Sequence, residues 1–206
     1  MAVLSISRQF GAGGKTLGES VALELGYKFL HETMMDKLAQ EIEKKPEANG
    51  HPDMVMELLA SLGPVNFIES YAGSGHPEFN EKRHLESLTT VINELAAYGN
   101  IVLLGRGSQF ILRYHKKTIK VLLVAELEHR VDFMVKTYGL EPLEARNMIT
   151  QADKKRQRFL RHFYPGEPDE SSLYHMALNT SLVPLDTARD QMCKLVRRME
   201  KTWAGK

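Results

Sequence analysis

The sequence predicts a three-layer α/β/α fold, in which helices cover both faces of a parallel sheet. Short apolar segments, typical of buried strands, alternate along the chain with longer segments whose apolar residues recur at helical spacing. This alternation requires crossover connections, which place neighbouring strands parallel to one another. A glycine-rich segment, residues 5–16, also joins the first strand to the first helix. In a parallel sheet, the loops that follow the strands lie together at the carboxyl ends of the strands, where ligands bind.

Five segments are predicted as strands because they are short, mostly apolar and bounded by turn residues. Residues 101–104 are all apolar, which excludes a position at an exposed edge of the sheet. The predicted strands span residues 2–7, 27–30, 101–104, 118–125 and 174–179.

The predicted helices show apolar residues spaced three and four apart. Gly26, Gly99 and Gly139 directly follow three of them and are expected to end them. Residues 45–75 are the least regular part, with a short apolar piece and a glycine-rich break, and we interpret them as an insertion that moves relative to the core. The predicted helices span residues 16–25, 32–44, 52–62, 78–98, 127–138, 142–161 and 185–203.

Composition limits the protein class. A chain of 206 residues, with 43% hydrophobic and 26% charged residues, suits one soluble domain. A formal net charge of +1 argues against a nucleic-acid partner held by bulk charge. The single cysteine, Cys193, excludes an internal disulfide and fits a reducing compartment. Because no stretch approaches the roughly 20 apolar residues of a membrane span and no signal-peptide pattern opens the chain, we expect a cytoplasmic protein without a membrane partner.

The glycine-rich segment has the order strand, loop, helix that a phosphate-binding loop requires. Glycines allow consecutive backbone N–H groups to turn toward one anion, and the helix adds its positive N-terminal end. A turn without a ligand rarely combines three glycines with Lys-Thr at the helix start. The residues predicted to hold nucleotide phosphates are Gly11, Ala12, Gly13, Gly14, Lys15 and Thr16.

The first of two possible registers for the lysine in this loop follows from the loop pattern. The pattern G-x-x-x-x-G-K-[ST] fits Gly14-Lys15-Thr16 only if Gln9 replaces the first glycine. In that register the Lys15 ammonium contacts phosphate oxygens and the Thr16 hydroxyl holds Mg²⁺. We favour this register because Lys15 is the only ammonium within reach of the loop.

With these residues in view, the chain resembles the cytidylate kinase-like proteins, a branch of the nucleoside monophosphate kinases among the P-loop kinases. Residues 6–14, Ile-Ser-Arg-Gln-Phe-Gly-Ala-Gly-Gly, resemble the signature of that branch, and residues 178–181, Leu-Asn-Thr-Ser, resemble a later one. Residues 105–107, Gly-Arg-Gly, resemble the Gly-Arg-Asp of cytidylate kinases. The resemblance covers nearly the whole chain and is weakest between residues 45 and 79.

The resemblance implies a single P-loop NTPase domain over residues 1–206 with a five-stranded parallel sheet. Strand 2–7 is then expected at the centre, with strand 101–104 beside it. It also implies a helical acceptor-binding lobe at about residues 32–76 and a short lid at about residues 150–168.

Roles for several cations follow from the resemblance. Lys37 and Arg106 fall on arginines that hold the acceptor phosphate, and His31 falls in the acceptor site. The lid arginines, which close over the transferring phosphoryl group, are Arg156, Arg158 and Arg161. A simpler alternative stays open for each of these cations. Lys37 and Arg106 are then solvated surface residues, and the three lid arginines lie on a solvated helix face.

Three departures from the family pattern affect these roles. Gly107 replaces an aspartate, and His31 with Glu32 replaces Asp-Thr. An ungapped alignment also places Gly14, and not Lys15, on the catalytic lysine of the family. The two registers of the loop therefore remain open on the sequence alone.

The resemblance and the loop together favour an ATP- and Mg²⁺-dependent phosphotransferase. Its acceptor is expected to be a small phosphorylated molecule, most simply a nucleoside monophosphate such as CMP. Phosphoryl transfer depends on positioning and charge neutralisation, so no catalytic triad is required. Two alternatives stay open: a P-loop kinase of another small metabolite, and a nucleotide-binding regulatory protein with little turnover. The oligomeric state is not predicted.

Overall fold

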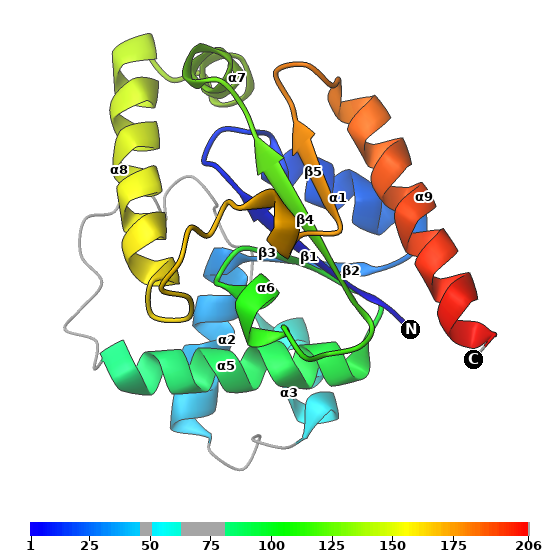
Figure 1. Ribbon diagram of the computed structural model, residues 1–206. Coiled ribbons are helices and arrows are strands. Elements are labelled where there is room, and N and C mark those ends of the chain that lie inside the picture. The colour runs from blue at the N-terminus through cyan, green and yellow to red at the C-terminus, as the bar shows by residue number, and fades with distance from the viewer. Residues whose placement is uncertain (46–50, 63–80, 206) are drawn as a thin grey trace.

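A computed structural model describes residues 1–45, 51–62 and 81–205. Within these ranges a five-stranded sheet has the order β2-β3-β1-β4-β5, and every neighbouring pair is parallel (Figure 1). The α/β fold with β1 at the centre and β3 beside it is thus confirmed. The strands are β1 (Val3–Arg8), β2 (Lys28–His31), β3 (Ile101–Leu104), β4 (Thr118–Val124) and β5 (Met176–Asn179).

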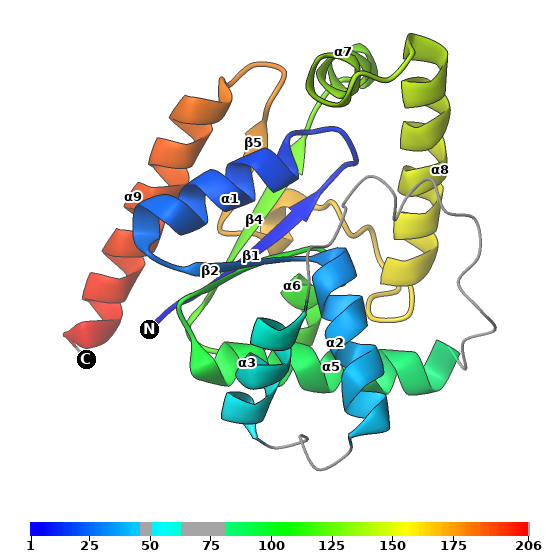
Figure 2. The same cartoon turned by 180° about the vertical axis from the view of Figure 1, so that it is seen from behind.

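Helices cover both faces of the sheet (Figures 1 and 2). One face packs against α1 (Gly14–Leu25) and α9 (Leu185–Ala204), and the other against α2 (Glu32–Lys44), α3 (Pro52–Ser61) and α5 (Glu81–Tyr98). Beyond the carboxyl end of β4 follow α7 (Leu127–Tyr138) and α8 (Pro142–Leu160). None of the helices in the described ranges combines the length and the apolar character needed to cross a bilayer.

The alternation of side chains along β1 separates two cores. Leu4 and Ile6 face the layer of α1 and α9, whereas Val3 faces the layer of α2 and α5. All three are fully buried. Ser5 and Ser7 alternate with these apolar residues and are buried as well, as expected for a central parallel strand covered on both faces.

Element boundaries differ from the predictions at a few ends. Helix α1 begins at Gly14, two residues earlier than predicted, directly after its left-handed N-cap Gly13. The short helix α6 (Ser108–Ile111) and the 3₁₀ helix η2 (Ser171–Leu173) carry too few residues to show a periodicity. The predicted apolar piece at 65–71 and the glycine break at 73–75 lie outside the described residues.

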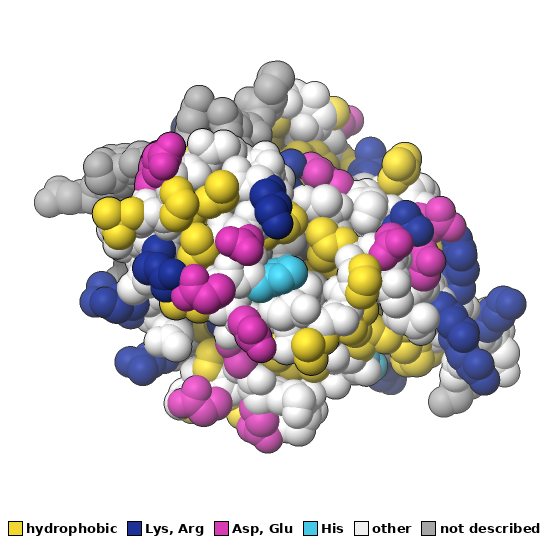
Figure 3. Space-filling model, turned by 90° about the horizontal axis from the view of Figure 1, so that it is seen from above, with side chains coloured by type: hydrophobic (Ala, Val, Ile, Leu, Met, Phe, Trp, Pro, Cys, Tyr) yellow, Lys and Arg dark blue, Asp and Glu magenta, His cyan; other side chains and the backbone are white. Residues whose placement is uncertain are grey.

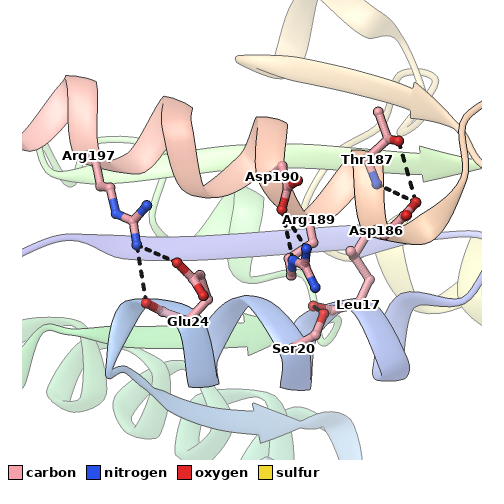
Figure 4. Close-up of polar contacts among 8 residues, drawn as sticks. All are labelled: Leu17, Ser20, Glu24, Asp186, Thr187, Arg189, Asp190 and Arg197. Atoms are coloured by element: carbon pink, nitrogen blue, oxygen red, sulfur yellow. Dashed lines mark hydrogen bonds and ion pairs between the residues drawn. The ribbon is translucent and has the colours of Figure 1, made fainter.

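Charged side chains of both signs are interspersed on the face toward which β4 points (Figure 3). A denser group of Lys and Arg side chains lies at the edge formed by the C-terminal part of α9. There α9 packs along α1, and Arg197 donates to the Glu24 carboxylate at 2.7 Å (Figure 4). This surface pair contributes little stability, so the apolar core between the two helices holds them together.

Gly18 allows α1 to lie close to β2. A Cβ at this position would lie 2.4 Å from Cε2 of Phe29. We therefore expect Gly18→Ala to destabilise the protein by about 1–3 kcal/mol, because overpacking outweighs the helix propensity gained. Denaturant unfolding measures the change.

Gly26→Ala is the matched control for Gly18→Ala. A Cβ added at Gly26 would have no atom within 4 Å, but the φ of 68° disfavours a side chain. We therefore expect the free energy of unfolding to fall by about 1 kcal/mol, from backbone strain alone. An unchanged or higher stability of Gly18→Ala would show that Phe29 moves aside and that close packing at this point is unimportant.

Candidate active site

The glycine loop delivers the N-terminus of α1 to the carboxyl edge of the sheet. Gly11 and Gly13 have φ values of 82° and 74°, a conformation that favours glycine. No side chain caps the helix at Gly13. Because the first amides of a helix have no partner within it, this turn presents N–H groups to an anion. The loop therefore fits a phosphate group.

The outer side of the loop is held by α7 and α8. Asp153 accepts a hydrogen bond from the Phe10 amide at 3.2 Å, and Arg130 donates to the Phe10 carbonyl at 3.1 Å. The two side chains also pair with each other at 2.6 Å. This support was not predicted, although the position of Arg130, next to Val131 on the apolar stripe of α7, was a usable signal. Both neighbouring helices thus fix the position of the loop backbone.

Lys15 and Thr16 lie at the start of α1, next to the loop. The Lys15 ammonium is 2.6 Å from the Glu19 carboxylate, one turn further along the helix, and Thr16 is exposed. The Lys15 ammonium must leave Glu19 to reach a phosphate. The predicted roles of Lys15 and Thr16 stay predictions. Among the described residues, no three His, Cys, Asp or Glu side chains gather as metal ligands.

Arg106 follows β3 and points to α2. Residues 105–107 all have positive φ, and the Arg106 guanidinium pairs with Asp36 while lying 5.3 Å from the centre of the Phe159 ring. His84 of α5 approaches the same carboxylate at 3.4 Å. Burial alone would raise the pKa of Asp36, but Arg106 and His84 outweigh it and lower that pKa. Asp36 is therefore a carboxylate that orients Arg106.

His31 and Lys37 differ in their surroundings. His31 is buried at the N-terminus of α2, and burial lowers its pKa, so its imidazole is neutral at pH 7. Lys37 is exposed, whereas its neighbour Asp36 faces inward. Asp36 was not among the predicted site residues, although its spacing of four from Glu32 places both acids on one side of α2. The acceptor roles of His31 and Lys37 stay predictions.

Of the three predicted lid arginines, only Arg156 reaches the ends of the strands. Its guanidinium donates to the Ser7 hydroxyl at 2.8 Å and to both oxygens of Asp169, at 2.5 and 3.1 Å. Gln109 also donates to the Ser7 hydroxyl, at 3.3 Å. Arg158 and Arg161 are exposed. The structure therefore separates one inward cation from two outward ones, and their shared catalytic role stays a prediction.

A further arginine, Arg8, lies at the end of β1 itself. Its guanidinium pairs with Glu32, and the two side chains are only 11% and 4% exposed. Arg8 also lines a small pocket together with the loop glycines and Phe133, Met134 and Tyr138 of α7. Arg8 was not among the predicted site residues, because the signature at residues 6–14 contains it without giving it a role.

A larger cavity of about 420 Å³ lies away from this edge, between α1 and α9. Its walls carry both charge signs, and Arg197 and Glu24 in it pair with each other. The glycine loop and the paired arginines are instead found together at the carboxyl edge, which we take as the candidate active site.

Comparison with curated proteins found a partial match. A cytidylate kinase from Methanopyrus kandleri (strain AV19) is 32% identical over 96 residues, which cover 43% of this chain and 50% of that protein. The chain therefore spans about half the length of this curated relative.

Two solved structures share the fold. An uncharacterised protein from Eubacterium ventriosum has a TM-score of 0.70 at 16% identity, with 96% of this chain and 99% of that chain covered. A gluconokinase from Sinorhizobium meliloti 1021 has a TM-score of 0.52 at 14% identity, with 98% and 95% covered.

The comparison with protein families covers most of the chain. The model of the cytidylate kinase-like family matches residues 3–182, a range that includes the glycine loop, Arg106 and the lid arginines. The chain therefore belongs to the cytidylate kinase-like family.

Proposed function

We propose that this protein transfers the terminal phosphoryl group of ATP to a small phosphorylated acceptor, most simply a nucleoside monophosphate such as CMP. The observation that carries this proposal is the gathering of paired arginines around the glycine loop. Arg8, Arg106 and Arg156 come from different elements, and each is held by a carboxylate. Guanidinium groups fixed in this way are suited to phosphate oxygens, whose charge they neutralise during transfer.

The donor side of the proposed site is the loop from Gly11 to Thr16. Its amides and the N-terminus of α1 hold the ATP phosphates, and Lys15 adds an ammonium when it leaves Glu19. Magnesium is held mainly by phosphate oxygens and water, with the Thr16 hydroxyl as the protein ligand. The metal neutralises charge on the phosphates when bound.

The acceptor side is formed by Arg106, with Lys37 and His31 on α2. Arg106 has the strongest structural support, because Asp36 and Phe159 fix its guanidinium. We propose that residues 32–76 form the acceptor-binding lobe, of which 46–50 and 63–76 lie outside the described residues. An altered acceptor site, with Gly107 in place of the family aspartate, also permits a different small metabolite.

The lid is proposed at residues 150–168, which include Arg156, Arg158 and Arg161. Arg156 already lies against the strand ends, and the two exposed arginines reach the phosphates only when the lid closes. Closure excludes water and so limits simple hydrolysis of ATP. The single, buried Cys193 fits the reducing cytoplasm in which we propose that this reaction takes place.

The proposal is tested by measuring ADP release from MgATP with a panel of nucleoside monophosphates and small metabolites. We expect release to rise well above the rate without acceptor for a phosphorylated acceptor, CMP first. The reaction without acceptor is the control for hydrolysis. Release with an unphosphorylated metabolite alone would favour a metabolite kinase.

A second candidate function is a nucleotide-binding regulatory protein with little turnover. The observation that favours it is Gly14 at the first position of α1, where the family alignment places a catalytic lysine. Tight ATP binding without ADP release across the whole panel would support this candidate and contradict the transferase.

A further inference from the structure

The glycine loop has an unusual distribution of side chains when its pattern is counted from Arg8. In this register, G-x-x-x-x-G-K places its first glycine at residue 8, its second at 13 and its lysine at 14. The chain has Arg8, Gly13 and Gly14 at these positions, and Lys15 where the full pattern has Ser or Thr. The long cation and one glycine have therefore exchanged places across the loop. The start of α1 at Gly14, with left-handed Gly13 before it, agrees with this register.

Arg8 and Gly14 are packed against each other in space. A Cβ on Gly14 would lie 2.9 Å from Cγ of Arg8 and 3.3 Å from its Cβ. A Cβ on Gly105 would lie 2.7 Å from Nη1 of Arg8. The arginine side chain therefore runs from the end of β1, across the first residue of α1, to the end of β3. Glycine at 14 and 105 leaves the space that this path requires.

The guanidinium of Arg8 is held near the loop and not in solvent. Its Nη2 donates to Glu32, the first residue of α2, and the pair is almost fully buried. A buried guanidinium is stable only with such a partner. Arg8 nevertheless lines the small pocket that Gly11, Gly13 and Gly14 also line, so a ligand in this pocket can contact Arg8 from the loop side. Lys15 lines the same pocket, but it is more exposed and pairs with Glu19 on its own helix.

We propose that Arg8 is the principal cation for the β- and γ-phosphates of ATP, reaching them from the central strand in place of a lysine at the start of α1. This inference rests on the proposed function and assigns a residue of that same site. A guanidinium is permanently charged and offers two parallel donors to a phosphate, which an ammonium does not. Glu32 is then a positioning residue that holds Arg8 in place, and Lys15 is a secondary cation.

The first test measures direct binding of MgATP, ADP and AMP to Arg8→Met by calorimetry. We expect ATP affinity to fall about 10- to 100-fold, because a hydrogen bond to a charged group is lost, while AMP affinity changes less than about threefold. Lys15→Ala should lose less ATP affinity than Arg8→Met. Arg146→Met, which removes an exposed arginine paired with Glu128, is the matched control and should bind as wild type.

Arg8→Met leaves Glu32 buried without its arginine, and this can impair folding. The double variant Arg8→Met/Glu32→Gln removes that charge, and we expect the same selective loss of ATP affinity in it. Circular dichroism and thermal unfolding establish that each variant is folded.

The sharpest test is the exchange variant Arg8→Gly/Gly14→Lys, which restores the G-x-x-x-x-G-K part of the ordinary pattern and leaves Lys15 at its Ser/Thr position. Gly14→Lys alone should lose stability, because its side chain collides with Arg8. Arg8→Gly alone should lose ATP affinity, and the exchange variant should regain at least about tenfold of it. A role for Arg8 that is only structural predicts no such recovery selective for ATP over AMP.

Three results would overturn the assignment: ATP binding by Arg8→Met as tight as wild type, a larger loss in Lys15→Ala, or no recovery in the exchange variant. Because binding is measured without an acceptor, failure of the transferase proposal is distinguishable. Wild-type protein that binds ATP but phosphorylates nothing contradicts the transferase alone. Wild-type protein that binds no ATP contradicts both proposals.

Discussion

We expect the Arg156→Ala variant to lose about 10²- to 10³-fold in kcat, with a much smaller change in the KM for ATP. Of the three predicted lid arginines, Arg156 is the one whose guanidinium reaches the end of β1, where it contacts Ser7. Negative charge on the phosphoryl oxygens grows toward the transition state, so removing one fixed donor there costs about this factor. Steady-state ADP release with a saturating acceptor measures it.

Arg156→Lys tests the chemistry of the same position. Lysine keeps the positive charge but not the planar fork, which currently engages both oxygens of Asp169. We expect it to recover only part of the lost rate, because a point charge replaces paired donors. Asp169→Asn removes the carboxylate and leaves the arginine, so it should retain more activity than Arg156→Ala.

The matched controls for Arg156 are Arg158→Ala and Arg161→Ala. Both side chains are exposed, and neither variant should change stability measurably. In the proposed function these two arginines reach a phosphate only when the lid closes, so we expect their loss to lower kcat less than the loss of Arg156. Equal rates in all three variants and the wild type would show that the basic run is only a solvated helix face. A uniform large loss would instead mean that the closed lid brings all three cations to the phosphates.

The features that the sequence predicted well depend on local properties. Apolar runs located all five strands, and glycines located the ends of α1 and α7, because left-handed backbone at Gly26 and Gly139 depends on the residue type itself. The start of α1 was predicted late because glycine is a poor helix former, and Gly14 was therefore assigned to the loop. The resemblance added the strand order, which periodicity alone cannot provide.

The partners of the charged residues could not be predicted in the same way. Arg156 and Ser7 are 149 residues apart in the chain, and Arg130 and Phe10 are 120 apart. Such pairs are created by the strand order and the crossovers, not by spacing along one helix. The interior positions of Asp36 and Arg8 likewise depend on neighbouring strands, so the sequence offered the right residue types without their pairings.

The second large effect is expected for Arg106→Ala, which should lower kcat/KM for the acceptor by about 10²- to 10³-fold. Arg106 lies at the end of β3, beside the central strand. Asp36 of α2 and the Phe159 ring orient its guanidinium. If it holds the acceptor phosphate, its loss removes a charge-assisted, bidentate contact and misplaces the attacking oxygen. The KM for ATP should change by less than about threefold, since we propose that the loop amides hold the donor.

Arg113→Ala is the matched control for Arg106→Ala, because Arg113 lies shortly after it, is exposed, and stacks its guanidinium 4.7 Å from the centre of the Tyr114 ring. We expect wild-type kinetics from this control. Asp36→Asn provides a second readout: the Arg106 guanidinium remains but loses the carboxylate that orients it, so the acceptor KM should rise while ATP binding is retained. Equal losses for acceptor and ATP in Arg106→Ala would place this arginine between the two substrates and not on the acceptor alone. Wild-type acceptor kinetics would leave Arg106 as a structural partner of Asp36, joining β3 to α2 without a role in substrate binding.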